Sequence, residues 1–156
     1  MLPALVAVAF TLMSPAFTPG GALPRAQAHS IDDCGGNNVS PALRWSGAPT
    51  AAKSFALTVF DPDANPPRGW WHWIVLDIPA NVHEFAAGTV PRAVRQATNS
   101  FGDAGYGGPC PPPGPLHHYV FTLYALDTAH VDGTPDAATF AKHALAHATL
   151  IGTYAR

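Results

Sequence analysis

The sequence predicts an all-β domain, an antiparallel β-sandwich of two sheets with one late helix before the closing strand. Seventeen prolines and 14 glycines are scattered between apolar runs, a pattern that indicates many turns. Three of the runs have the length and composition of strong strands. Apolar residues make up 47% of the 156 residues, too many for a disordered chain and enough for a single domain with one core.

Charge and hydropathy exclude several classes of partner. Only 12% of the residues are charged and the net charge is −2, so no basic surface argues for nucleic acid. No span reaches the roughly 18 consecutive apolar residues of a transmembrane helix, so we expect no stable membrane insertion. Residues 1–10 are similar to the apolar part of a signal peptide but lack a basic start and a clear cleavage site. We expect a cytoplasmic location rather than a periplasmic or secreted one.

The first half of the chain predicts strands separated by one long loop. We expect residues 1–9 to be a leader or a poorly ordered N-terminus, and residues 10–156 to form the domain. Weak alternation over residues 4–13 predicts an edge strand, and the polar residues 14–38 predict a loop. Residues 39–45 lead into a short strand. Residues 53–60 form a strong strand whose two faces are both largely apolar, so we expect both to be covered.

The second half predicts two more strong strands and the helix. Residues 70–78 form the second strong strand and residues 116–127 the third, with little regular structure over residues 79–115. Thr134 is the expected N-cap of a helix that has Pro135 at its first position and runs to about His147. Residues 150–154 predict the closing strand.

Aspartates and histidines mark one end of each strong strand. Asp61 and Asp63 follow the first strand, His72 starts the second between two tryptophans, and His117 and His118 start the third. The aspartates alone would be ordinary turn formers. Converging on one rim, the carboxylates would instead raise the histidine pKa values and favour charged imidazolium near neutral pH.

Such a mixed site suits a zwitterion, for example a phosphate ester that bears an ammonium group. The phosphate would face histidine and backbone N–H groups, and the ammonium would face a carboxylate. Gly105, Gly107 and Gly108 would let the backbone approach an anion closely.

An enzyme is the weaker interpretation. Asp61 with His72 or His117 could act as the acid–base pair of a hydrolase of small esters or phosphoesters. The chain has no Gly-x-Ser-x-Gly motif, and neither cysteine lies in an evident cationic environment. His143 and His147 would share a helix face, but a zinc site of this kind needs a glutamate between them and a third ligand. We therefore expect no enzymatic activity, no metal and no cofactor.

Several motifs stand in a characteristic order: Cys34-Gly-Gly-Asn-Asn-Val-Ser-Pro41, Asp61-Pro-Asp63-Ala, Trp71-His72-Trp73, Asn99-Ser-Phe-Gly102, Gly107-Gly-Pro-Cys-Pro-Pro, His117-x-Tyr119 and Leu150-Ile-Gly-Thr-Tyr154. In this order and spacing they resemble the phosphatidylethanolamine-binding protein family, most closely its bacterial Raf-kinase-inhibitor-like branch. The resemblance covers about residues 10–156.

The resemblance implies a β-sandwich with a small anion-binding pocket at one end. Members of the family bind phosphate-bearing head groups, and some eukaryotic members inhibit kinases or act in signalling. We therefore expect this protein to bind a small anion or a phosphorylated head group, with a regulatory or inhibitory role. The alternative is a protein inhibitor with a vestigial pocket. We expect these residues to line or support the pocket: Asp61, Asp63, Trp71, His72, Gly108, Pro111, His117 and Tyr119.

The sequence departs from the family pattern in specific places. His118 replaces an arginine, so we expect a salt bridge to be missing there, and Asn65 interrupts the usual Ala-Pro, so its loop could differ in shape. The long C-terminal segment of eukaryotic members is absent, so their kinase binding does not carry over. Cys34 and Cys110 fall in motifs near the pocket, and a disulfide and two buried thiols are equal alternatives. An exposed apolar face of the sandwich could support a homodimer.

Overall fold

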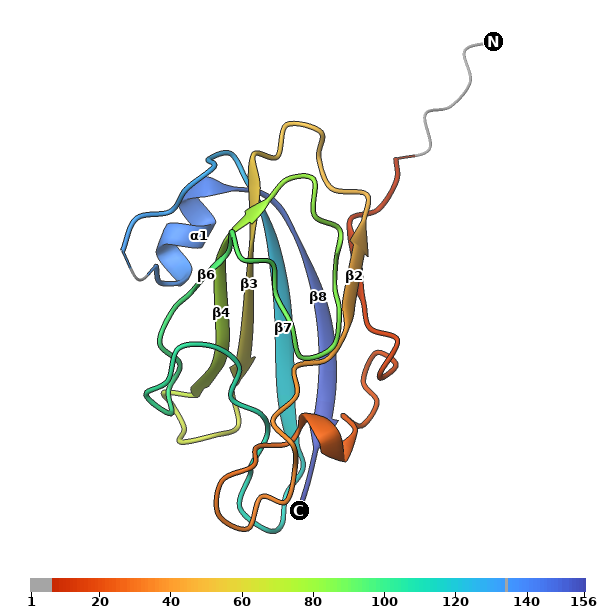
Figure 1. Ribbon diagram of the computed structural model, residues 1–156, viewed down its shortest axis with the longest axis vertical. Coiled ribbons are helices and arrows are strands. Elements are labelled where there is room, and N and C mark those ends of the chain that lie inside the picture. Colours follow the sequence, from red (N-terminus) through yellow and green to blue (C-terminus); the bar gives the residue numbers. More distant parts are fainter. Residues whose placement is uncertain (1–6, 134) are drawn as a thin grey trace.

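Two antiparallel sheets face each other in the computed structural model, which describes residues 7–133 and 135–156 (Figure 1). The smaller sheet has the order β1-β2-β5, with β1 at Thr11–Met13, β2 at Leu43–Ser46 and β5 at Glu84–Phe85. The larger sheet has the order β6-β4-β3-β7-β8. Its strands are β3 (Ser54–Asp61), β4 (Trp70–Pro79), β6 (Arg95–Gln96), β7 (His117–Leu126) and β8 (Ala144–Tyr154). The predicted fold class is confirmed.

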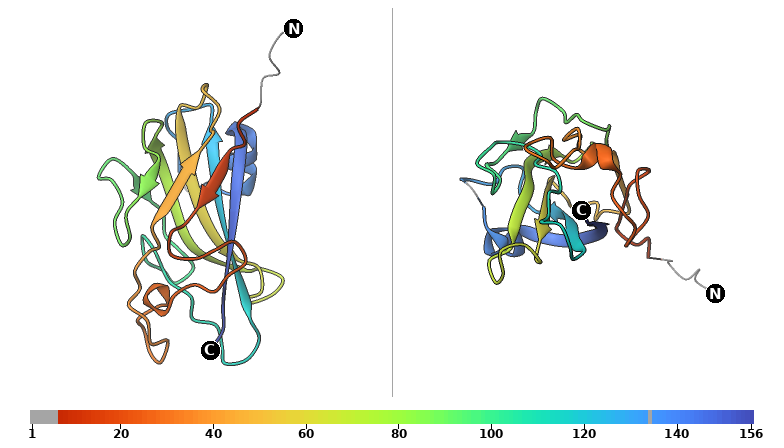
Figure 2. Two further views of the ribbon diagram at one scale, coloured as in Figure 1. Left: turned by 90° about the vertical axis from the view of Figure 1, so that its right-hand side faces the viewer. Right: turned by 90° about the horizontal axis from the view of Figure 1, so that it is seen from below.

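The three predicted strong strands form the centre of the larger sheet, with β3 between β4 and β7. One face of β3 packs into the main core between the sheets through Phe55, Leu57 and Val59. Its other face contributes Ala56 to a second cluster, in which Phe140 from the helix α1 (Ala137–His143) covers the sheet. Figure 2 shows the two sheets and the helix in side and end views. Both faces of β3 are covered, as its two-sided apolar pattern predicts.

The C-terminal helix is shorter than the sequence predicts. Asp136 caps it by accepting the N–H of Thr139 at 2.9 Å, and it ends at His143. The expected N-cap, Thr134, lies outside the described residues. The prediction of helix up to His147 is wrong because the chain from Ala144 onward pairs with β7 as β8. This long antiparallel pairing overrides the helix propensity of an alanine-rich segment.

The N-terminal edge strand is also short. Within the described residues it comprises only β1, which pairs with β2, and residues 4–6 of the predicted range lie outside the described part. In residues 7–133 and 135–156 we find no helix with the length and apolar character needed to cross a membrane.

Antiparallel pairing places three strand ends together. The end of β3 at Asp61 lies beside the start of β4 at Trp70, and the start of β7 at His117 lies at the same end of the sheet. The long connections over residues 14–42 and 97–116 gather around this end, which is the lower end in Figure 1. The connection over residues 97–116 supplies Phe101, Cys110, Pro111 and Pro112 to the wall of the site.

Candidate functional site

A pocket of about 460 Å³ opens at this end of the sandwich, within the range of small-molecule sites. Six of the eight residues expected there line it. The lining residues are Asp61, Asp63, Ala64, Asn65, Pro66, Trp70, His72, Phe101, Cys110, Pro111, Pro112, His117 and Tyr119. The strand ends therefore converge as predicted, and binding by these residues stays a prediction.

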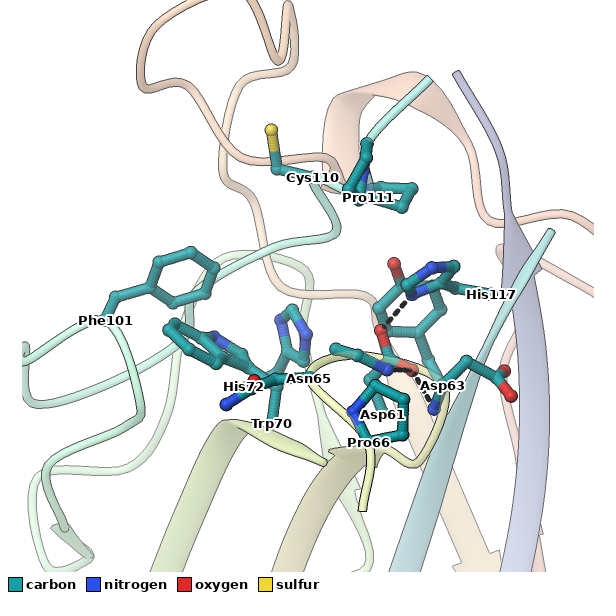
Figure 3. Close-up of a pocket in the computed structure, with 13 residues that line it drawn as sticks. Asp61, Asp63, Asn65, Pro66, Trp70, His72, Phe101, Cys110, Pro111 and His117 are labelled. Carbon is teal, nitrogen blue, oxygen red and sulfur yellow. Dashed lines mark hydrogen bonds and ion pairs between the residues drawn. The ribbon is translucent and has the colours of Figure 1, made fainter. Parts of the chain in front are cut away.

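Asp61 is almost fully buried, and its carboxylate organises one side of the pocket. Oδ1 accepts the N–H groups of Asp63 at 2.8 Å and of Ala64 at 3.2 Å, which fixes the turn after β3. Oδ2 accepts Nδ1–H of His117 at 2.7 Å (Figure 3). Because Nδ1 of His117 is engaged in this way, Nε2 is the ring nitrogen that remains for a ligand.

His72 faces the pocket because β4 has a bulge. Trp71 pairs with Phe60 and Trp73 with Val59, so His72 has no partner residue in β3. A bulge of this kind inserts one extra residue and redirects its side chain. Two hydrogen bonds join His72 to Gly107. The backbone carbonyl of His72 accepts the N–H of Gly107 at 2.8 Å, and the ring Nδ1–H of His72 donates to the Gly107 carbonyl at 2.6 Å.

The electrostatic state of His72 differs from the sequence-based expectation. Burial lowers the pKa of His72 to about 4, and this effect exceeds the opposing influence of the Gly107 carbonyl and of Asp61. The ring is therefore neutral at pH 7. Since a carbonyl can only accept a hydrogen bond, the single ring proton lies on Nδ1 and Nε2 is an acceptor. The expected charged imidazolium is wrong for His72.

Two hydrogen-bonding groups in the pocket lining have no partner among the described residues. They are the hydroxyl of Tyr119 and the indole Nε1–H of Trp70, and both atoms are buried. Burial also raises the pKa of the Tyr119 phenol. A buried polar group without a partner costs about 1–3 kcal/mol. The sequence interpretation missed Trp70, although alternation along the strand places it on the same side as His72.

Two expected pocket residues lie elsewhere. Trp71 points to the opposite face of the sheet, where its ring packs 4.6 Å from the ring of Phe60. Gly108 donates its N–H to Oδ1 of Asn38 at 2.7 Å, so that group does not face an anion. A side chain at residue 108 would collide with the carbonyl of Gln27. Gly108 is therefore needed for the close packing of two loops.

Asp63 lines the pocket and also ties the turn after β3 to the start of β7. Its Oδ2 accepts both the backbone N–H and the Nδ1–H of His118, each at 2.8 Å. The side-chain hydrogen bond from His118 is the main reason that the pKa of Asp63 is lowered. At the position where a salt bridge was expected to be missing, the structure has these hydrogen bonds from His118 to Asp63.

A disulfide joins Cys34 to Cys110, whose Cα atoms are 5.3 Å apart. Of the two alternatives that the sequence left open, the structure has the disulfide. Beside it, the N–H of His29 donates to the carbonyl of Pro109 at 2.9 Å. The loop that carries Cys34 therefore holds the wall that contains Cys110 and Pro111.

The histidines at residues 143 and 147 do not come together as a pair of metal ligands. His143 donates from Nδ1 to Asp127 at 2.9 Å, while His147 lies in β8 and so does not share a helix face with it. Within the described part of the chain, no three His, Cys, Asp or Glu side chains gather in a way that could hold a metal ion.

Two packed antiparallel sheets with a pocket where the central strands end define a β-sandwich protein with a ligand-sized terminal site. The family model described as phosphatidylethanolamine-binding protein matches residues 13–155. The chain belongs to the phosphatidylethanolamine-binding protein family.

Bacterial relatives agree with this membership. YbcL of Escherichia coli K12 is 44% identical over 133 residues, which cover 80% of this chain and 73% of YbcL. YbhB of the same organism is 39% identical over 127 residues, which cover 78% of this chain and 80% of YbhB.

Solved structures agree as well. The crystal structure of E. coli YbcL, described as a new member of the mammalian family, matches with a TM-score of 0.87 and 38% identity and covers 94% of this chain and 98% of that one. The homologue CT736 from Chlamydia trachomatis matches with a TM-score of 0.82 and 35% identity and covers 95% and 98%.

Proposed function

We propose that this protein binds a small oxyanion in the pocket, with a phosphate group as the best fit. The observation that carries the proposal is the pairing of His117 with the buried carboxylate of Asp61, in a cavity where the hydroxyl of Tyr119 and the indole N–H of Trp70 have no described partner. A ligand oxygen that reached either of these buried groups would give it the acceptor that it lacks. Charge-assisted hydrogen bonds of this kind are strong.

Because His72 is neutral, it gives the pocket no positive charge, and an anion of low charge fits the pocket better than a highly charged one. Asp61 carries a negative charge beside His117, so the pair brings no net positive charge to the pocket whether or not the imidazole is protonated. His72 offers an acceptor at Nε2, which suits a ligand that carries its own proton. The monoanion of a phosphomonoester has both a proton donor and acceptor oxygens.

We propose that the pocket binds its ligand without catalysing a reaction. The pocket lining contains no serine, threonine or lysine, and Cys110 is held in the disulfide. A water molecule activated by the His117–Asp61 pair is the route to hydrolysis that this lining leaves. The regulatory role, a protein partner and a homodimer stay predictions that the pocket itself does not address.

The disulfide also bears on location. Disulfides persist in oxidising compartments and are rare in the cytosol. The Cys34–Cys110 bridge therefore favours a periplasmic or secreted protein over the cytoplasmic location expected from the N-terminal residues.

Phosphate titration followed by histidine NMR tests the binding function. We expect inorganic phosphate at millimolar concentration to shift the imidazole signals of His72 and His117 and to saturate. His117→Gln removes the saturable shift of His72, whereas His83→Gln, at an exposed loop position, keeps it. Unshifted signals in the wild-type protein contradict the proposal. Release of phosphate from phenyl phosphate that depends on His117 would support the hydrolase instead.

A further inference from the structure

Both carboxylates of the pocket already have partners. Asp61 accepts three hydrogen bonds, from the backbone N–H groups of Asp63 and Ala64 and from His117. Asp63 accepts two hydrogen bonds from His118 at one oxygen. Figure 3 shows the Asp63 carboxylate pointing away from Trp70 and His72. Both oxygens of Asp61 therefore have partners, and Asp63 directs its carboxylate away from the Trp70 side of the cavity, so neither presents a carboxylate to a substituent that lies there.

The side of the cavity opposite His117 is apolar and aromatic. Trp70 and Phe101 form it, with ring centroids 5.3 Å apart in an edge-to-face arrangement (Figure 3). Pro111 and Pro112 add further apolar surface to the lining. Large flat apolar surfaces of this kind favour contact with a flat apolar group.

This wall is held in place before any ligand arrives. The ring of Phe101 packs 4.6 Å from the ring of His29 and 5.4 Å from the ring of His72. The carbonyl of Pro111 accepts a hydrogen bond from Nε of Arg156 at 2.6 Å, and the adjacent Cys110 is in the disulfide. A preorganised wall binds its complement without a large ordering cost.

We infer that the pocket selects a phosphomonoester whose ester group is flat and apolar, such as an aryl phosphate, over one whose ester group carries an ammonium. The phosphate lies at His117 and Tyr119, and the aryl group lies against Trp70 and Phe101. This inference rests on the proposed oxyanion site and adds the chemistry of the substituent. It replaces the zwitterion that the sequence led us to expect.

Comparative calorimetry with four ligands tests the selectivity. We expect phenyl phosphate to bind about tenfold more tightly than phosphoethanolamine, the equivalent of about 1.4 kcal/mol. The affinity of inorganic phosphate, which has no ester group, gives the contribution of the anion site alone. Phosphocholine is included because aromatic faces also attract cations.

A pair of proline variants supplies a matched control. Pro112→Asp puts a carboxylate on the exposed rim of the pocket. We therefore expect this variant to bind phenyl phosphate more weakly, and phosphoethanolamine more tightly, than the wild-type protein does. Pro113→Asp adds the same charge one residue further on, at an exposed position outside the lining, and we expect it to keep wild-type selectivity.

The outcomes separate the two proposals. If phosphoethanolamine or phosphocholine binds the wild-type protein as tightly as phenyl phosphate does, the proposed preference for an aryl phosphate is wrong. The proposed oxyanion site is supported by the same result. If none of the four ligands binds, inorganic phosphate included, the oxyanion site fails and the selectivity fails with it. A tenfold preference that Pro112→Asp reduces and Pro113→Asp leaves intact supports both.

Discussion

The neutral, buried imidazole of His72 links the pocket to the pH dependence of stability. Its pKa of about 4 lies below the value of about 6.5 in an unfolded chain. Between these two values the unfolded state binds a proton that the folded state does not. Stability therefore falls as the pH drops from about 6.5 toward 4, and the contribution is fully present above that window.

We predict that His72 accounts for about 2 kcal/mol of the stability lost between pH 7 and pH 5. Urea unfolding of the wild-type protein and of His72→Gln at both pH values measures this, because glutamine can still donate to the Gly107 carbonyl. His29, whose pKa burial also lowers, is present in both proteins and cancels. His83→Gln, as the control, keeps the wild-type pH dependence. Equal pH dependence in the wild type and His72→Gln would show that His72 does not stay neutral.

Two tyrosines of the same region, the buried Tyr119 and the partly buried Tyr106, allow a matched comparison. The hydroxyl of Tyr119 has no described partner, whereas that of Tyr106 donates to the Gln27 carbonyl at 2.9 Å. We predict that Tyr119→Phe leaves the free energy of unfolding of the unliganded protein nearly unchanged and weakens phosphate binding. Tyr106→Phe should cost about 1 kcal/mol or more, because it leaves a buried carbonyl unpaired.

Urea unfolding and phosphate titration of both variants provide the measurements. A loss of stability in Tyr119→Phe as large as that in Tyr106→Phe would mean that the Tyr119 hydroxyl has a partner in the unliganded protein. Unchanged phosphate affinity in Tyr119→Phe would remove this hydroxyl from the proposed site.

At the scale of secondary structure, strands with strong patterns were predictable and segments that depend on a partner were not. The three central strands begin and end within one residue of their predicted bounds because apolar runs and flanking prolines mark them. Trp71 was expected in the pocket from the family resemblance, whereas alternation along the strand places Trp70, two residues before His72, on the pocket side. The segment after His143 has a composition typical of a helix and becomes a strand only because β7 is beside it.

The helix α1 stabilises the face of the sheet that is opposite the main core. Phe140 is 1% exposed, and its ring stacks on Tyr124 with centroids 4.9 Å apart and an interplanar angle of 9°. It belongs to the second apolar cluster, with Ala56 and Ile74. The pocket residues belong to the end of the sheet and to its loops, so the helix and the pocket are separate features of the fold.

We predict that Phe140→Ala lowers the free energy of unfolding by about 3–5 kcal/mol and leaves phosphate binding unchanged. Chemical denaturation and the histidine titration measure the two properties on the same protein. Leu145→Ala removes an apolar side chain that is 44% exposed at the start of β8, and we expect it to have little effect on either property. Loss of phosphate binding in folded Phe140→Ala would show that the two faces of the sheet are coupled.

At the scale of the whole molecule, the pocket collects residues from five separate segments of the chain. Motifs at these segments predicted that Asp61, His72 and His117 would meet, because the antiparallel order of β4, β3 and β7 brings their ends together. The motifs could not predict the charge of His72, which depends on how deeply the surrounding loops bury it. They also left open whether the loops that carry Cys34 and Cys110 come within bonding distance.

The disulfide closes a loop between residues that are 76 positions apart. In the chain-entropy model, a cross-link over this distance stabilises the fold by about 4 kcal/mol. Two hydrogen bonds join the same loops without it, from His29 to Pro109 at 2.9 Å and from Gly108 to Asn38 at 2.7 Å. The covalent bond should therefore contribute more to global stability than to the shape of the pocket.

We predict that the double variant Cys34→Ser/Cys110→Ser loses about 4 kcal/mol of unfolding free energy and keeps the wild-type imidazole signal of His117. Urea unfolding and NMR at pH 7 measure the two quantities. Dithiothreitol should reproduce the loss of stability in the wild-type protein and have no effect on the double variant. If the His117 signal is lost in the folded double variant, the hydrogen bonds between the loops are too weak to hold the pocket wall. If the double variant unfolds at the wild-type urea concentration, the disulfide contributes nothing to the stability of the oxidised protein.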